Sequence, residues 1–238
     1  SSSMCAIVDG KSVDTTMGFT PLDGLVMATR SGSIDPGLVL WLEDHVGMPA
    51  AELASTLEPR SGLLGLAGTA DMRAILVAEA AGDEAATLAI GVYLHRLRAS
   101  IAAMVAALGG LDVLVFTGGV GEHAPAIRLP GKSAPGGILQ ERLGLVEGRR
   151  YVGRVVLAGD PSAAPIRERV AADLAYLGVA VDPAVNAEIH GDGAIGQAGA
   201  PVHTLVIVAR EDLEIAREVR AVLGFNAVEG VPDHGLAG

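Results

Sequence analysis

The sequence is poor in aromatic residues, in cysteine and in positive charge. Aromatic residues make up 3% of the 238 residues, so the core must be built from alanine, valine, leucine and isoleucine. The single cysteine, Cys5, excludes an internal disulfide and fits a reducing compartment. Lysine and arginine number 17 against 28 aspartate and glutamate residues, which gives a formal net charge of −11. This charge argues against a nucleic-acid-binding surface, which needs a basic patch, but it leaves nucleotide binding open.

Long apolar runs are also missing from the sequence. No run reaches the ~18–20 residues that a membrane-spanning helix requires, and no signal-peptide pattern occurs. We therefore expect no membrane partner, no nucleic-acid partner and a cytoplasmic location. Hydrophobic residues make up 50% and charged residues 19%, so most of the chain is expected to fold around a sizeable core.

The order of the expected elements is that of an α/β protein. Residues 111–116 form an apolar run typical of a buried parallel strand, and residues 202–208 form a second one. The first strand runs into a glycine turn at 117–121, and the second runs into an acidic turn at 209–212. Because such sheets bind ligands at the carboxyl ends of their strands, both turns are candidates for a binding site.

We expect the chain to be organised around the glycine turn at 117–121. A strand, a glycine turn and a helix start let main-chain N–H groups approach a phosphate. The turn matches neither G-x-G-x-x-G followed by an acid nor a Walker A loop, and glycine turns after buried strands are common. Residues 131–133 end like a Walker A, but Ala126 stands where that motif needs glycine. Taken alone, the turn fits a structural role as well as a phosphate site.

The amino-terminal part is expected to form a β-hairpin followed by a long loop. Residues 3–9 and 12–16 flank an Asp-Gly turn signal. Residues 14–37 are dense in Gly, Thr, Asp and Pro, and long loops of this kind inside a compact domain are usually functional. Arg30 stands among small residues, where its guanidinium could reach a bound anion. The simpler alternative is a surface arginine in a salt bridge.

Several helices are predicted from their caps and apolar periodicity. Asp35 and Asp71 stand at N-cap positions, and Gly109-Gly110 ends the longest helical pattern. Residues 61–68 are interpreted as a glycine-spaced turn, and residues 155–157 as a possible strand. The expected helices cover residues 36–46, 49–58, 72 onward, 83–108 and 165–178.

Five segments, taken in order, resemble signatures of the acetate kinase family. They are DTTMGFTPLDGL at 14–25, TRSGSIDP at 29–36, SGLLG at 61–65, DMR at 71–73 and FTGGVGE at 116–122. The first and last are long motifs seldom seen elsewhere, and the resemblance covers residues 4–128 and 164–225. It implies an actin-like, Hsp70-like and sugar-kinase-like α/β fold of two ribonuclease-H-like halves, with ATP and Mg²⁺ in the cleft. It further implies transfer of the γ-phosphoryl group of ATP to acetate or a similar short-chain carboxylate, which yields an acyl phosphate and ADP.

The resemblance also implies roles for individual residues. Arg30 would stabilise the transferring phosphoryl group, a role that suits a reaction in which equatorial charge must be neutralised. Glu211 would be the carboxylate associated with Mg²⁺, a hard cation that takes oxygen ligands. The family usually has Asn where this chain has His123, and also where it has Arg210. The residues expected to line the adenosine site are Asp71, Met72 and Arg73, and those of the nucleotide loop are Gly119, Val120, Gly121, Glu122 and His123.

The resemblance covers only part of the family's length. Its amino-terminal half, with the first phosphate loop, the carboxylate pocket, a second catalytic arginine and the catalytic aspartate, has no counterpart in this sequence. We therefore expect residues 1–225 to be the carboxy-terminal, nucleotide-binding half. Residues 129–163 are expected to be an atypical insertion in it, and residues 226–238 a flexible tail.

Two functions from different classes stay open at this point. With its missing half, the chain would phosphorylate acetate or a similar short-chain carboxylate, and the 238 residues alone are expected to be inactive. Alternatively, the chain is a catalytically inactive half-domain that binds nucleotide or dimerises. The family pairs through its carboxy-terminal half, so a homodimer is expected. A sugar-kinase-like relative is a third alternative, for which the sequence offers no polyol site.

Overall fold

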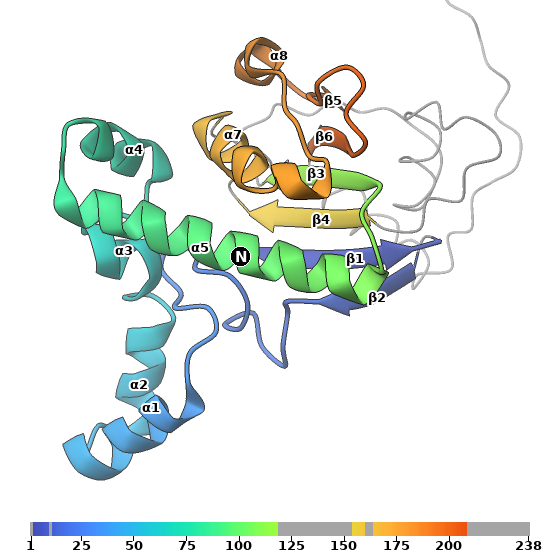
Figure 1. Ribbon diagram of the computed structural model, residues 1–238. Coiled ribbons are helices and arrows are strands. Elements are labelled where there is room, and N and C mark those ends of the chain that lie inside the picture. The colour runs from blue at the N-terminus through green and yellow to red at the C-terminus, as the bar shows by residue number, and fades with distance from the viewer. Residues whose placement is uncertain (1, 10, 119–153, 160–163, 209–238) are drawn as a thin grey trace, which may run out of the picture.

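The computed structural model describes residues 2–9, 11–118, 154–159 and 164–208 (Figure 1). Its described strands form one mixed six-stranded sheet in the order β2-β1-β4-β3-β6-β5. β3 runs parallel to its neighbours β4 and β6, whereas the β1–β2, β1–β4 and β5–β6 pairs are antiparallel. The strands are β1 (Ser3–Val8), β2 (Lys11–Thr15), β3 (Val113–Gly118), β4 (Arg154–Gly159), β5 (Gly193–Ala194) and β6 (His203–Val208).

Strands β3 and β6 lie where the two apolar runs predicted them. Leu114 and Phe116 of β3 belong to the large core cluster, whereas Val113 and Val115 form a second cluster with Leu205 of β6. Successive residues of a strand point to opposite faces of a sheet. Both faces of β3 are therefore covered, as predicted for a buried parallel strand.

Strand β4 joins the amino-terminal hairpin to the rest of the sheet. Val156 pairs with Cys5 of β1 on one side and with Val115 of β3 on the other. The strand predicted at 155–157 is thus confirmed. It comes from the segment interpreted as an insertion, whose other residues, 129–153 and 160–163, lie outside the described part of the chain. This segment supplies a central strand of the sheet.

The helices gather mainly on one side and at one end of the sheet (Figure 1). Two follow the predicted caps: the Asp35 carboxylate accepts the Gly37 N–H at 2.8 Å, and that of Asp71 accepts the Arg73 N–H at 2.9 Å. The π-helical turn η1 (Leu42–Val46) continues α1, and the 3₁₀ turn η3 (Ala175–Leu177) follows α7. The α-helices are α1 (Pro36–Trp41), α2 (Ala50–Leu57), α3 (Gly62–Ala67), α4 (Met72–Ala80), α5 (Glu84–Leu108), α7 (Ala164–Asp173) and α8 (Pro183–Glu188).

One predicted element was wrong, and one predicted helix is confirmed over only part of its length. Residues 61–68, interpreted as a turn, contain the helix α3, because four good helix formers lie between Gly62 and the left-handed cap Gly68. The helix predicted over 165–178 ends at Asp173 as an α-helix, and a 3₁₀ turn completes the segment up to Gly178.

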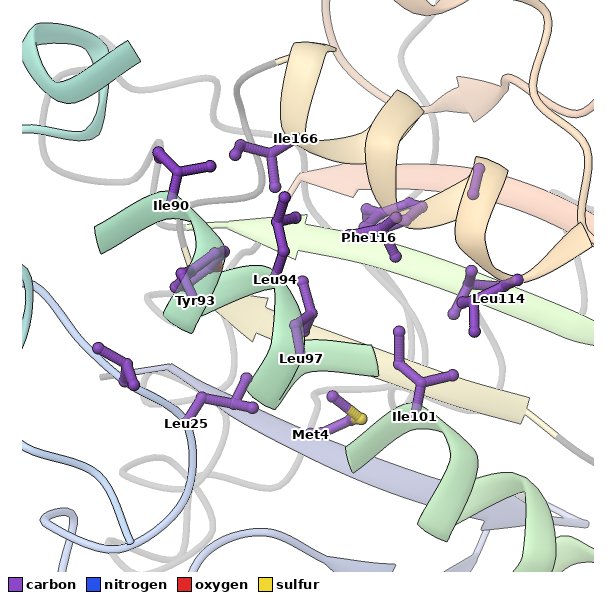
Figure 2. Close-up of a cluster of buried hydrophobic side chains, with 14 of the residues drawn as sticks. Met4, Leu25, Ile90, Tyr93, Leu94, Leu97, Ile101, Leu114, Phe116 and Ile166 are labelled. Atoms are coloured by element: carbon purple, nitrogen blue, oxygen red, sulfur yellow. The ribbon is translucent and has the colours of Figure 1, made fainter. Parts of the chain in front are cut away.

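The core lies between the sheet and helices α5 and α7, which cover the same face (Figures 1 and 2). Figure 2 shows Leu94, Leu97 and Ile101 of α5 directed toward the strands, close to Met4 of β1 and Phe116 of β3. All five side chains are buried. Burying an aliphatic or aromatic side chain of this size contributes about 1.5–3 kcal/mol, so α5 holds the hairpin and the parallel strands together.

Among the described residues, α5 is the one helix that is long and apolar enough to cross a membrane by length and composition alone. Its nine buried residues include Ala89, Ile90, Tyr93 and Met104, which belong to the core described above. The helix therefore serves as a core element in this fold.

A buried arginine connects α7 to α8. The guanidinium of Arg167, which is 4% exposed, donates from Nε to Asn186 Oδ1 at 2.7 Å and from Nη2 to the Asn186 carbonyl at 2.9 Å. Asn186 in turn donates from Nδ2 to the carbonyl of Ala164 at 2.9 Å. Burial lowers the pKa of the Arg167 guanidinium, because desolvation disfavours its charged form. The hydrogen bonds to Asn186 offset part of that cost.

Candidate functional site

Several strand ends meet at one edge of the sheet. Gly118, the last residue of β3, lies in register with Gly159 at the end of β4 and with Val208 at the end of β6. The predicted nucleotide loop, Gly119 to His123, and the predicted metal ligand Glu211 follow two of these ends. Those residues lie outside the described part of the chain, so their roles stay predictions.

The loop that carries Arg30 starts from the same edge. β1 is antiparallel to β4, and Ser3 at its start pairs with Ala158 near the end of β4. β2 returns to that edge, where the Thr16 N–H donates to the carbonyl of Met4 at 3.0 Å. The long loop therefore leaves the sheet on the side where the parallel strands end.

The long loop is closed at its base by a hydrogen-bonded clasp. The Ser33 N–H donates to the carbonyl of Gly24 at 2.9 Å, and the Ser33 hydroxyl donates to Asp23 Oδ1. Gly32, with φ of +71°, makes the return possible: a Cβ there would lie 2.4 Å from the carbonyl oxygen of Leu25. Only glycine adopts that conformation without strain in so tight a space.

Three apolar residues anchor the loop in the core. Leu25, Val26 and Met27 are 3%, 8% and 4% exposed, and Leu25 and Val26 belong to the main core cluster. Figure 2 shows Leu25 next to the hydrophobic cluster of α5. The segment just before Arg30 is thus fixed by hydrophobic packing as well as by the clasp.

Residues at the start of α3 form backbone hydrogen bonds with the segment before Arg30. The N–H groups of Ser61, Leu63 and Leu64 donate to the carbonyls of Thr29, Met27 and Ala28 at 2.8, 2.9 and 2.9 Å. The N–H groups at the start of a helix have no partner within the helix. Here they bind the loop, and the two elements form one unit.

Arg30 itself is half-buried at the end of this supported loop. Within the described ranges, no carboxylate forms an ion pair with its guanidinium. The alternative of a surface arginine in a salt bridge therefore finds no partner in that part of the chain. A cation fixed by its backbone and without a carboxylate partner there can receive an anionic group such as a phosphate.

The predicted adenosine-site residues lie at the start of α4. Asp71 and Arg73 are exposed, and the Asp71 carboxylate caps the helix. Met72 is 4% exposed and belongs to the main core cluster, so its side chain packs inside the protein. The predicted role of the three residues in nucleotide binding stays a prediction.

The described residues fit a phosphate better than they fit a metal ion. They contain no group of three His, Cys, Asp or Glu side chains that could hold a metal. Arg30, in the loop that starts from the edge where β3, β4 and β6 end, is a cation without a carboxylate partner in those residues. A magnesium site would depend on Glu211, beyond the described ranges.

A hollow in the described part of the chain lies away from the sheet edge. It is shallow and open and follows the outer side of α5, and none of the predicted site residues lines it. Its lining residues are Thr87, Leu88, Gly91, Val92, His95 and Arg96.

The fold and the sheet edge together define an α/β class of protein. A mixed sheet with an antiparallel hairpin on one side of parallel strands, helices on one face and glycine-ended strands is an α/β arrangement suited to phosphate-bearing ligands. Solved structures that match it carry the actin-like fold of acetate and propionate kinases, which confirms the predicted fold class.

Residues 1–131 match the sequence model of the Acetokinase family, and the chain belongs to that family. It is 40% identical over 217 residues to the acetate kinase of Clavibacter michiganensis subsp. michiganensis, a match that covers 91% of this chain and 45% of that protein. The acetate kinase structure of Porphyromonas gingivalis is 33% identical with a TM-score of 0.69, over 93% of this chain and 46% of that one. The propionate kinase structure of Francisella tularensis subsp. tularensis is 36% identical with a TM-score of 0.68, over 91% and 45%.

The chain spans about half the length of the relatives it matches. The predicted family is confirmed. The match has the extent expected if this chain corresponds to one half of the family's length.

One backbone contact of the candidate site was not predicted from the sequence. The pattern at Ser61, Gly62 and Leu63 favours a turn and does not connect them with Arg30. The SGLLG motif at 61–65 marked this segment as part of the family resemblance, but its pattern does not indicate which residues it contacts.

Proposed function

We propose that this chain is the nucleotide-binding half of an ATP-dependent kinase that phosphorylates acetate or propionate. Membership of the Acetokinase family supports the reaction class, and relatives named for both substrates support the pair of acceptors. The observation that carries the proposal is Arg30, a cation held by a rigid loop on the side of the sheet where the parallel strands end.

The proposed reaction is an in-line displacement at phosphorus. A carboxylate oxygen of acetate attacks the γ-phosphorus of ATP, the bond from that phosphorus to the β,γ-bridging oxygen breaks, and acetyl phosphate and ADP form. The Arg30 guanidinium would donate hydrogen bonds to the equatorial oxygens of the transferring group and offset their charge. Because the loop already holds Arg30, little reorganisation is needed when the charge develops.

The remaining site residues complete the proposal. Gly119, Val120, Gly121, Glu122 and His123 would hold the phosphates of ATP or ADP, and Asp71, Met72 and Arg73 would line the adenosine. Glu211 would hold Mg²⁺, which would neutralise part of the negative charge of the nucleotide phosphates. Arg210 beside it, where the family usually has Asn, would add a positive charge to that place.

The alternative is a half-domain that binds nucleotide or pairs without catalysing the transfer. The match covers about half of each relative's length and supports both proposals alike. On the kinase proposal the 238 residues alone are inactive as well, because the acyl pocket belongs to the other half. The two proposals therefore differ only once that half is supplied.

Two measurements test the proposal. Calorimetric titration of the 238-residue chain with ADP and Mg²⁺ should show binding, since the nucleotide loop is proposed to lie in this half. The chain mixed with the amino-terminal half of an acetate kinase should form acetyl phosphate from ATP and acetate, which hydroxylamine traps as the hydroxamate. Nucleotide binding without any hydroxamate from the mixture would favour the non-catalytic alternative. No binding would contradict the kinase proposal and leave, of the alternative, only a half-domain that pairs.

A homodimer in the cytoplasm belongs to the same proposal. Helix α1 buries none of its residues, and Leu40 and Trp41 on it are 65% and 51% exposed, as expected of a surface that a second copy could cover. Light scattering at micromolar concentration should give about twice the chain mass of 24.1 kDa. The mass of a single chain would remove the dimer from the proposal.

A further inference from the structure

Gly62 makes the closest backbone contact with the loop that carries Arg30. A Cβ added at this position would lie 2.2 Å from the carbonyl oxygen of Met27, 2.6 Å from that of Arg30 and 3.1 Å from the Arg30 nitrogen. All three are backbone atoms, so no side chain can rotate out of the way. Real Cβ atoms essentially never come within 3.0 Å of another group, so any side chain here would have to displace Arg30 or α3.

The hydrogen bonds around Gly62 prevent the two segments from simply moving apart. The N–H groups of Ser61 and Leu63, on either side of Gly62, donate to Thr29 and Met27 at 2.8 and 2.9 Å. The Met27 N–H donates to the carbonyl of Arg30 at 3.2 Å and closes the turn that presents the arginine. Gly62 therefore lies directly against the turn, between two of its hydrogen bonds.

We infer that Gly62 is a positioning residue: the absence of its side chain sets where the Arg30 backbone lies, and so where its guanidinium reaches. This inference rests on the proposed function of Arg30 in phosphoryl transfer. To restore an ordinary contact of 3.4 Å, the distance between a Cβ at 62 and the Met27 oxygen must grow by about 1 Å. A displacement of that size in a group that stabilises the transition state can lower the rate by about 10²-fold.

The same helix offers a matched control. Gly62 has φ of +61° and Gly68, at the other end of α3, has φ of +72°, so alanine would need a positive φ at both positions. A Cβ at Gly68 would find nothing within 4 Å. Gly62→Ala and Gly68→Ala thus share the cost of a left-handed alanine and differ in the contact with the turn.

The first readout needs no activity. In ¹H–¹⁵N spectra of the 238-residue chain, the amide signals of residues 27–31 and the Arg30 Nε–Hε signal are compared in wild type, Gly62→Ala and Gly68→Ala. Shifts of these signals in Gly62→Ala alone are the expected result. Unchanged signals in Gly62→Ala, or equal shifts in both variants, would overturn the inference.

The second readout is acetyl phosphate formation by the reconstituted mixture. Gly62→Ala should lower kcat by about 10²-fold with little change in the KM for ATP, whereas Gly68→Ala stays within about threefold. In an Arg30→Ala background, Gly62→Ala should have no further effect, because it acts through Arg30. A further loss in that background would overturn the positioning role and leave only a structural one. A wild-type mixture without activity would contradict the proposed function, and the spectra would still decide the inference.

Discussion

The Ser33 N–H donates to the carbonyl of Gly24 at 2.9 Å and closes the loop between them. This closure brings the two ends of the segment 24–33 together, with Arg30 three residues before Ser33. The neighbouring Gly32 permits the closure through its left-handed conformation.

Replacing Gly32 by alanine should loosen this loop. The variant combines a positive φ of +71° with a Cβ only 2.4 Å from the Leu25 carbonyl oxygen. Gly47→Ala is the matched control, since Gly47 has the same φ of +71° and open space around it. We expect Gly47→Ala to cost about 1–2 kcal/mol and Gly32→Ala to cost about 1–3 kcal/mol more. Urea unfolding of both variants measures the difference, and equal losses would contradict the proposed crowding.

Removing the side chain of Asn186 should destabilise the contact between α7 and α8. Asn186→Ala removes the Oδ1 atom that accepts from the buried Arg167 guanidinium. It also removes the Nδ2 group that donates to the carbonyl of Ala164. The expected loss in free energy of unfolding is about 1–3 kcal/mol. Val185→Ala, at an exposed position of the same helix, is the control and should change stability by less than about 0.5 kcal/mol. A loss in Asn186→Ala no larger than in the control would refute the role given to this pair.

The ion pair between Glu79 of α4 and Arg169 of α7 should make a small, salt-dependent contribution. Arg169 Nη1 donates to both oxygens of the Glu79 carboxylate at 3.1 and 2.8 Å. The Glu79 side chain is 20% exposed and the Arg169 side chain is 41% exposed. A double-mutant cycle with Glu79→Gln and Arg169→Met should give a coupling free energy of about 0.2–1 kcal/mol. The coupling should weaken as salt is raised to 1 M. A coupling above that range, unaffected by salt, would indicate a more buried pair than the geometry gives.

Proline at Val156 should disrupt the sheet. Val156 lies between Cys5 of β1 and Val115 of β3, in a strand with neighbours on both sides. Proline cannot donate to the ladder and is excluded from central strands. We expect Val156→Pro to lower the unfolding midpoint strongly, whereas Val156→Thr, which keeps the N–H and suits a strand, should have a much smaller effect. A folded, equally stable proline variant would mean that residues 154–159 are a dispensable part of the segment 129–163.

Local signals in the sequence predicted most of the elements. Asp35 and Asp71 cap the helices as expected, and Gly109 ends α5. The run at 111–116 predicted β3 because a strand buried on both faces is apolar throughout. These signals depend only on a residue and its near neighbours, and therefore they can be interpreted without the fold.

The contacts that build the candidate site could not be predicted in this way. The place of β4 between β1 and β3 depends on pairing between residues about 150 apart in the chain, such as Cys5 and Val156. The contact of Gly62 with Arg30 is between two backbone segments. Such a contact has no signature in the hydrophobic periodicity or the charge pattern of the sequence. The resemblance identified Arg30, and only the structure shows what holds it.

The measurement that tests the central claim most directly compares two arginines. Arg30→Ala and Arg60→Ala are assayed for acetyl phosphate formation in the reconstituted mixture, with ADP affinity measured alongside. Arg60 is the control because its guanidinium is exposed and donates to Ser55 and Thr56 instead of remaining available to a ligand. We predict a fall in kcat of at least about 10³-fold for Arg30→Ala, and a change within about threefold for Arg60→Ala. If Arg30→Ala retains activity within about tenfold of wild type, Arg30 does not stabilise the transferring phosphoryl group and the proposed mechanism is wrong.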